Sequence, residues 1–93
     1  MMRFGDDARP CLVKGSRLMW DEARKQHVLL VPEGALMLNR TAAEVLELCT
    51  GERTVAEIVA ALQEKYPGAP VAEDVHELLG RIAERGLIAD ARE

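Results

Sequence analysis

Aromatic residues are scarce in this chain of 93 residues, where Phe4, Trp20 and Tyr66 are the whole set. The core must therefore be built mainly from aliphatic side chains, and a platform for stacking nucleic-acid bases, which needs several aromatic rings, is disfavoured. No apolar run approaches the roughly 20 residues of a membrane span, and the first residues lack the apolar stretch of a signal peptide. We therefore expect a cytoplasmic protein that does not enter a membrane.

Residue patterns typical of catalysis are also missing. Ser16 is the only serine and has no GxSxG context, while His27 and His76 have no cysteine or carboxylate at a recurring ligand spacing. Cys11 and Cys49 lack a CxxC pattern, and both are expected to be reduced thiols. Neighbouring carboxylates are interpreted as solvated charge: Asp6-Asp7, Asp21-Glu22 and Glu73-Asp74. We expect no enzyme activity, no metal and no cofactor.

Charge is distributed unevenly along the chain. The net charge is −4, with seven basic and five acidic residues in positions 1–40 and five basic and eleven acidic residues in positions 41–93. The second part, at −6, repels phosphate, so nucleic acid is not an expected partner.

The first half of the chain predicts a three-stranded antiparallel meander. Residues 17–20 and 27–31 are rich in aliphatic and β-branched side chains and are joined by the charged turn 21–25, as in a hairpin. Residues 32–34 contain proline and glycine and end the second strand, and residues 35–38 predict a short third strand. Consecutive strands are usually neighbours, which leaves the first and third strands as edges.

The second half predicts three helices, the first two of which begin with the same pattern. Thr41 with Glu44, and Thr54 with Glu57, are each spaced as a capping box. Apolar residues follow each box at helical spacing: Ala42, Val45, Leu46 and Cys49 in the first helix, and Val55, Ile58, Val59 and Leu62 in the second. Gly51 is expected to end the first helix, and residues 66–68 the second.

Pro70 suits the first turn of the third helix, and one apolar stripe follows it: Val71, Val75, Leu78, Leu79 and Ile82. Gly86 fits a left-handed C-terminal position, with Leu87 folding back on Ile82 in a Schellman-type contact and a short extended piece at residues 87–88. The chain is thus expected to be α+β and winged helix-turn-helix-like, a three-stranded antiparallel sheet followed by three helices.

Three function classes fit this fold. A winged-helix DNA-binding protein would place the third helix in the major groove, but the exposed face of that helix has more carboxylates than arginines. A peptide-binding protein would use the short third strand, which lacks an internal lysine or proline, to pair with an extended peptide. In a structural subunit, that edge would simply be covered. The residues alone leave peptide capture and a covered edge equally open.

The ordered combination of several segments resembles the PqqD family of pyrroloquinoline quinone (PQQ) biosynthesis. These segments are Trp20-Asp21-Glu22 and residues 28–34, 36–39, 41–49, 51–59 and 74–88. The resemblance extends over about residues 9–88. It implies a peptide chaperone, a recognition element for ribosomally made and modified peptides. Such a chaperone binds the precursor peptide PqqA and presents it to PqqE, a radical S-adenosylmethionine enzyme that cross-links a Glu and a Tyr.

The resemblance also implies where the peptide binds. In the family the precursor adds as a strand beside the third strand and lies against the third helix. Carried onto this chain, the peptide-binding residues are Ala35, Leu36, Met37, Leu38, Val75, Leu78, Leu79 and Ile82. We expect residues 1–16 to form an N-terminal arm, residues 17–88 a single peptide-recognition domain and residues 89–93 a C-terminal tail.

Overall fold

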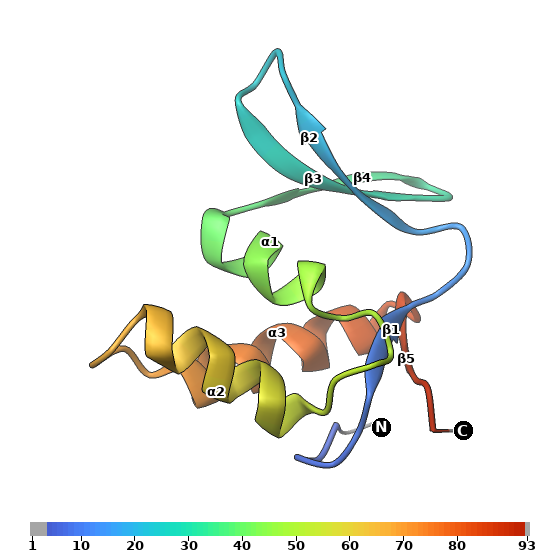
Figure 1. The fold of residues 1–93 in the computed structure, drawn as a ribbon. Helices are drawn as coiled ribbons and strands as arrows, with labels where there is room; N and C mark the ends of the chain where they lie inside the picture. Colours follow the sequence, from blue (N-terminus) through green and yellow to red (C-terminus); the bar gives the residue numbers. More distant parts are fainter. Residues whose placement is uncertain (1–3, 93) are drawn as a thin grey trace.

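A sheet and a layer of helices pack face to face in the computed structural model, which describes residues 4–92 (Figure 1). The chain runs β1 (Pro10–Leu12), β2 (Arg17–Asp21), β3 (Gln26–Val31), β4 (Gly34–Leu38), α1 (Arg40–Glu47), α2 (Val55–Lys65), α3 (Val71–Glu84) and β5 (Ile88–Asp90). The α+β fold class is confirmed, with a three-stranded antiparallel sheet followed by three helices. Residues 1–3 of the expected arm and Glu93 of the expected tail lie outside the described residues.

The three-stranded sheet has the order β2-β3-β4, and its two faces differ in what covers them. Leu18, Leu29 and Leu36 are cross-strand partners and pack into the main core, where Leu29 is fully buried. Side chains alternate between the two faces of a strand. The next row of partners, Met19, Val28 and Met37, therefore lies on the outer face.

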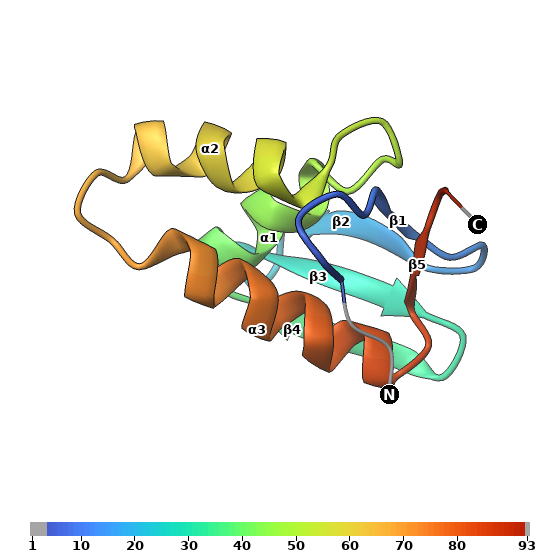
Figure 2. The ribbon, with the colours of Figure 1, turned by 90° about the horizontal axis from the view of Figure 1, so that it is seen from below.

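The helices cover the inner face of the sheet. Seen from below, α2 and α3 lie side by side beneath it (Figure 2), and residues of these two helices contact each other. The core is aliphatic, as expected from the shortage of aromatic residues. Among the described residues, no helix is both long and apolar enough to cross a membrane.

The start of α1 differs from the prediction. Asn39 is the N-cap, and its side-chain Oδ1 accepts a hydrogen bond from the backbone N–H of Ala42 at 2.8 Å. The predicted capping box of Thr41 with Glu44 is therefore wrong: Thr41 lies inside the helix. Asn caps a helix as well as Thr does, and β4 ends at Leu38, so the helix starts at the first capping residue after the strand.

The end of α1 also differs from the prediction. The helix ends at Glu47, before Gly51, and backbone N–H groups of Leu48 and Cys49 donate to carbonyls three residues back. Bonds of this kind tighten the last turn of a helix. Cys49 is buried there, which raises the pKa of its thiol to about 12 and keeps it protonated at neutral pH.

The predicted capping box of α2 is confirmed. Thr54 Oγ1 accepts from the backbone N–H of Glu57 at 3.2 Å, and Glu57 Oε1 accepts from the backbone N–H of Thr54 at 2.8 Å. Both bonds satisfy donors that have no partner within the helix.

We expect Thr54→Ala to lower the free energy of unfolding by about 0.5–2 kcal/mol, because it removes the side-chain acceptor of the cap. Urea denaturation followed by circular dichroism measures this loss. Thr41→Ala is the matched control and should stay within about 0.5 kcal/mol of the parent, since Thr41 is exposed and caps nothing. An equal loss in both variants would contradict the assignment of the two helix starts.

The end of α3 matches the prediction. Gly86 has a φ of 71°, its N–H donates to the carbonyl of Ala83, and the N–H of Leu87 donates to the carbonyl of Ile82 at 3.2 Å. This is a Schellman motif, and it turns the chain from α3 into β5.

The segment expected to be an arm packs onto the rest of the chain over its described residues. Backbone carbonyls of Asp6 and Ala8 accept from the first N–H groups of α2, at Ala56 and Val55. Phe4, Ala8 and Pro10 are buried. The strand β1 then pairs antiparallel with β5, which extends the expected last short strand into the tail. The N-terminal segment is ordered here because it caps α2 and completes a second, two-stranded sheet.

Candidate functional site

The strand β4 has one open edge. It pairs with β3 on one side, and among residues 4–92 no other segment forms a backbone hydrogen bond with it. It contains no proline or lysine, so two common protections of an edge strand are absent.

The register shows which residues offer backbone groups at this edge. Only Pro32 and Glu33 separate Val31 from its partner Gly34, so these partners form the hydrogen-bonded pair that closes the hairpin. Hydrogen-bonded and non-hydrogen-bonded pairs alternate along an antiparallel ladder. It follows that Leu36 and Leu38 direct their N–H and C=O groups to β3, whereas Ala35 and Met37 direct theirs to the open edge.

A hollow of about 360 Å³ lies between this edge and α3, and we call it the strand groove. Apolar side chains from β4 and α3 form most of its lining, beside Arg81 of α3 and Arg85, the C-cap of that helix. Its lining residues are Leu36, Met37, Leu38, Asn39, Ala42, Leu78, Arg81, Ile82 and Arg85. The strand groove can therefore accept apolar side chains from a segment paired with β4.

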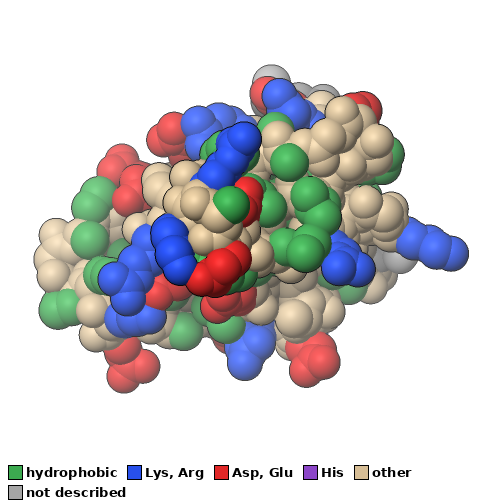
Figure 3. Space-filling model, turned by 90° about the horizontal axis from the view of Figure 1, so that it is seen from above, with side chains coloured by type: hydrophobic (Ala, Val, Ile, Leu, Met, Phe, Trp, Pro, Cys, Tyr) green, Lys and Arg blue, Asp and Glu red, His purple; other side chains and the backbone are tan. Residues whose placement is uncertain are grey.

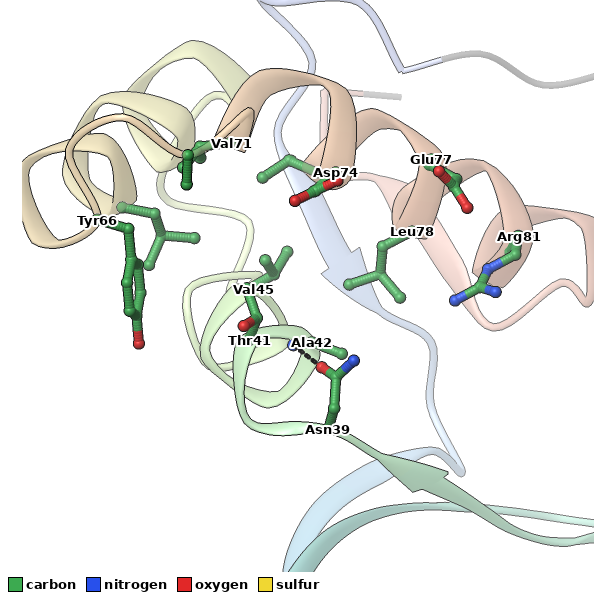
Figure 4. Close-up of a pocket in the computed structure, with 13 residues that line it drawn as sticks. Asn39, Thr41, Ala42, Val45, Tyr66, Val71, Asp74, Glu77, Leu78 and Arg81 are labelled. Atoms are coloured by element: carbon green, nitrogen blue, oxygen red, sulfur yellow. Dashed lines mark hydrogen bonds between the residues drawn. The ribbon is translucent and has the colours of Figure 1, made fainter.

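A second hollow, of about 330 Å³, lies among the three helices, and we call it the helix pocket (Figure 4). Its lining residues are Asn39, Thr41, Ala42, Val45, Leu62, Tyr66, Ala69, Val71, Asp74, Val75, Glu77, Leu78 and Arg81. In Figure 4, Val45 of α1 and Leu78 of α3 point toward the space between these helices. Four residues line both hollows, so the strand groove and the helix pocket adjoin.

One wall of the helix pocket is fixed by Glu44. This side chain accepts from Tyr66 Oη at 2.5 Å and forms an ion pair with Lys65, which joins α1 to the end of α2. Only 15% of its side-chain surface is exposed. The hydrogen bond from Lys65, followed by that from Tyr66, lowers the pKa of the Glu44 carboxyl, and Glu44 in turn raises the pKa of Tyr66.

We expect Glu44→Gln to lower the free energy of unfolding by about 1 kcal/mol at neutral pH, because it removes the charge from two hydrogen bonds at a partly exposed site. The folded-state pKa lies below the usual 4.5. The contribution is therefore present above pH 4.5 and is lost as the pH falls through the lower, folded-state value. Urea denaturation at neutral and acidic pH should show the two proteins converging in acid. Glu64→Gln, an exposed change on α2, is the control and should show no such convergence.

The structure distributes the expected site residues among four places: the strand groove, the helix pocket, the open edge and the core. Leu36, Met37, Leu38, Leu78 and Ile82 line the strand groove, and Val75 lines the helix pocket. Ala35 is exposed at the open edge. Leu79 is fully buried in the core and lines neither hollow, because it lies one residue round the helix from Leu78.

Sequence reasoning missed four residues of the strand groove: Asn39, Ala42, Arg81 and Arg85. The arginines had been placed on the solvent face of the third helix. Their spacing held the missing signal, since each lies three residues after an apolar residue of the groove, Leu78 or Ile82, and residues three apart are neighbours on a helix.

The outer face of the sheet carries an apolar patch, formed by Met19, Val28 and Met37. Figure 3 looks onto this side of the molecule, where hydrophobic side chains gather between Lys and Arg side chains. Met37 is 47% exposed, and its sulfur lies 3.7 Å from a guanidinium nitrogen of Arg24. The side chain of Met37 thus belongs to the outer face, while its backbone belongs to the open edge.

Within residues 4–92, no group of three or more His, Cys, Asp or Glu side chains is arranged to hold a metal ion. His27 and His76 each lie near a single carboxylate, Glu47 at 3.7 Å and Asp6 at 3.3 Å, and neither residue lines the strand groove or the helix pocket.

Several known proteins are similar to this chain in sequence. The family model "Coenzyme PQQ synthesis protein D (PqqD)" matches residues 26–88. A PqqA binding protein of Klebsiella pneumoniae is 51% identical over 67 residues, which span 71% of this chain and 73% of that protein. A PqqA binding protein of Rhodopseudomonas palustris strain TIE-1 is 39% identical over 90 residues, which span 95% of this chain and 88% of that protein.

A solved structure is similar as well. It is the solution NMR structure of the PqqD truncation of Methylobacterium extorquens PqqCD, described as a functional, stand-alone recognition element for ribosomally synthesized and post-translationally modified peptides. The TM-score is 0.80 at 34% identity, and the match extends over 92% of this chain and 94% of that one. The resemblance found in the sequence is therefore confirmed, and this chain belongs to the PqqD family of coenzyme PQQ synthesis proteins.

Proposed function

We propose that this chain is a peptide chaperone of PQQ biosynthesis, which binds the precursor peptide PqqA by strand addition at β4 and presents it to the radical S-adenosylmethionine enzyme PqqE. The observation that supports this proposal is the open edge of β4 beside an apolar hollow. Its relatives in Klebsiella pneumoniae and Rhodopseudomonas palustris are named PqqA binding proteins.

In this proposal the two kinds of contact come from different residues. Ala35 and Met37 supply backbone groups to the added strand, and net hydrogen bonds of this kind contribute about 0.5–1.5 kcal/mol each. Leu36, Leu78 and Ile82 supply the apolar wall that selects side chains. The helix pocket, with Val75 in its lining, accepts the residue of the peptide that lies beyond the end of β4.

Isothermal titration calorimetry with synthetic PqqA tests the binding step. We expect saturable one-to-one binding, and a scrambled peptide of the same composition should bind more weakly. Hydrogen exchange followed by NMR adds a test of the mode, because the amide of Met37 should become protected in the complex while that of Leu36 is protected already. Binding without protection at Met37 would contradict strand addition.

The presentation step needs its own measurement. The rate at which PqqE cross-links the Glu and Tyr of PqqA should rise when this chain is added in equal amount to the peptide. An unchanged rate, with peptide binding intact, would contradict presentation while leaving the binding step in place.

The proposal replaces the other two function classes raised by the sequence. DNA binding is disfavoured because the first turn of α3 contains Glu73 and Asp74. A helix that enters the major groove of DNA needs neutral or basic side chains there. The role of a structural subunit is disfavoured because, within residues 4–92, no segment pairs with the open edge of β4. We also propose that the chain acts without catalysis of its own and in the cytoplasm, where ribosomally made peptides are synthesised.

A further inference from the structure

The strand groove is locally basic within an acidic part of the molecule. Positions 41–93 carry eleven acidic and five basic residues. Two of those five basic residues, Arg81 and Arg85, line the strand groove, and its lining includes no acidic residue. The charged residues that line this apolar hollow are therefore both positive, in contrast to the acidic surplus of positions 41–93.

These two arginines are also available to a ligand. Lys65 pairs with Glu44, and Arg92 pairs with Asp7 and Asp90. Neither Arg81 nor Arg85 forms a salt bridge with any carboxylate in the part of the chain that the structure describes. Arg81 lies in the last turn of α3, and Arg85 is its C-cap with helical backbone angles, so these residues, four apart, lie on the same side of the helix end.

We propose, on the basis of the peptide-binding function above, that Arg81 and Arg85 select an Asp or Glu side chain on the peptide segment that adds to β4. A guanidinium group binds a carboxylate with two parallel hydrogen bonds, and such charge-assisted bonds are stronger than neutral ones. Backbone pairing accepts any extended sequence. The arginine pair therefore supplies sequence selection at this site, in addition to the apolar wall.

Acidic residues of the helix pocket add to this selection of a peptide carboxylate by repelling it from the pocket. Asp74 and Glu77 line that pocket beside Arg81, and neither of them lines the strand groove, where Arg85 lies. A carboxylate of the peptide is therefore attracted to the end of the site near Arg85 and repelled at the end near Asp74. The same pattern favours one register of the peptide along β4 over a slipped one.

Calorimetry with PqqA and the double variant Arg81→Gln/Arg85→Gln tests the inference. We expect binding to weaken by about tenfold to a hundredfold, the range for losing charge-assisted hydrogen bonds. The salt dependence of binding should also decrease, because the parent protein loses affinity as salt screens the charges. Lys14→Gln/Arg53→Gln is the matched control, since both residues are exposed and line neither hollow. Circular dichroism verifies that both double variants are folded.

A charge exchange locates the partner on the peptide. Each Asp or Glu of PqqA is changed singly to Lys, and one of these peptides should bind the parent protein poorly and bind Arg81→Glu or Arg85→Glu better. Equal affinity of the two double variants for PqqA would overturn the inference alone. Failure of the parent protein to bind PqqA would overturn the proposed function, and the inference with it.

Discussion

Leu79→Ala is expected to lower the free energy of unfolding by about 2–5 kcal/mol, because it leaves a cavity at a fully buried site in a packed core. A domain of this size has a total stability of about 5–14 kcal/mol, so the variant loses a large share of it. Chemical denaturation with urea measures the loss directly, and the thermal midpoint should fall with it.

Two comparisons make this result specific to Leu79. Leu30→Ala, a similar truncation at a half-buried position on the outer face of the sheet, should cost about 1 kcal/mol. At a temperature where Leu79→Ala is folded, its affinity for PqqA should match that of the parent protein, since Leu79 lines neither hollow. A stable Leu79→Ala variant with weakened peptide binding would contradict the assignment of Leu79 to the core alone and would show that it contributes to the binding site.

Met37→Pro is expected to weaken PqqA binding by at least tenfold while the sheet remains intact. The backbone N–H of Met37 faces the open edge, so proline removes a donor that β3 does not use, and its ring also obstructs an incoming strand. The loss of two or more backbone hydrogen bonds at about 0.5–1.5 kcal/mol each is sufficient for this effect. Calorimetry gives the affinity, and circular dichroism verifies the fold.

Neighbouring substitutions separate the backbone effect from other causes. Met37→Ala removes the same side chain but keeps the N–H group, and it should bind PqqA nearly as well as the parent protein. Leu36→Pro removes a donor that faces β3 and should instead destabilise the sheet. Unchanged affinity in Met37→Pro would count heavily against strand addition at β4.

Most of the fold was predictable because its signals are local. Alternating apolar residues placed β2, β3 and β4, the box at Thr54 placed the start of α2, and Gly86 placed the end of α3. The start of α1 was mispredicted because Asn39 and Thr41 are both good caps, and the end of the preceding strand decides between them. The order of the N-terminal segment depends on contacts with α2 and β5, which no local pattern encodes.

The candidate site was predictable in outline and less so in detail. The resemblance to the PqqD family pointed to the third strand and the third helix, and residues of both do line one hollow. An apolar stripe on a helix does not show which of its buried members also line a hollow, so Leu79 was grouped with Leu78. The arginines of the strand groove were missed for a related reason, since a charged residue beside the stripe can face either open solvent or a hollow.

The pairing of β1 with β5 affects how this protein matures during synthesis. Ribosomes add about 5–20 residues per second, so Pro10–Leu12 emerges from the exit tunnel well before Ile88–Asp90 exists to pair with it. Contacts between such distant positions form late in folding. The two-stranded sheet is therefore completed only after Ile88–Asp90 has been synthesised, and until then the first strand can bond only to residues such as Thr50 and Gly51.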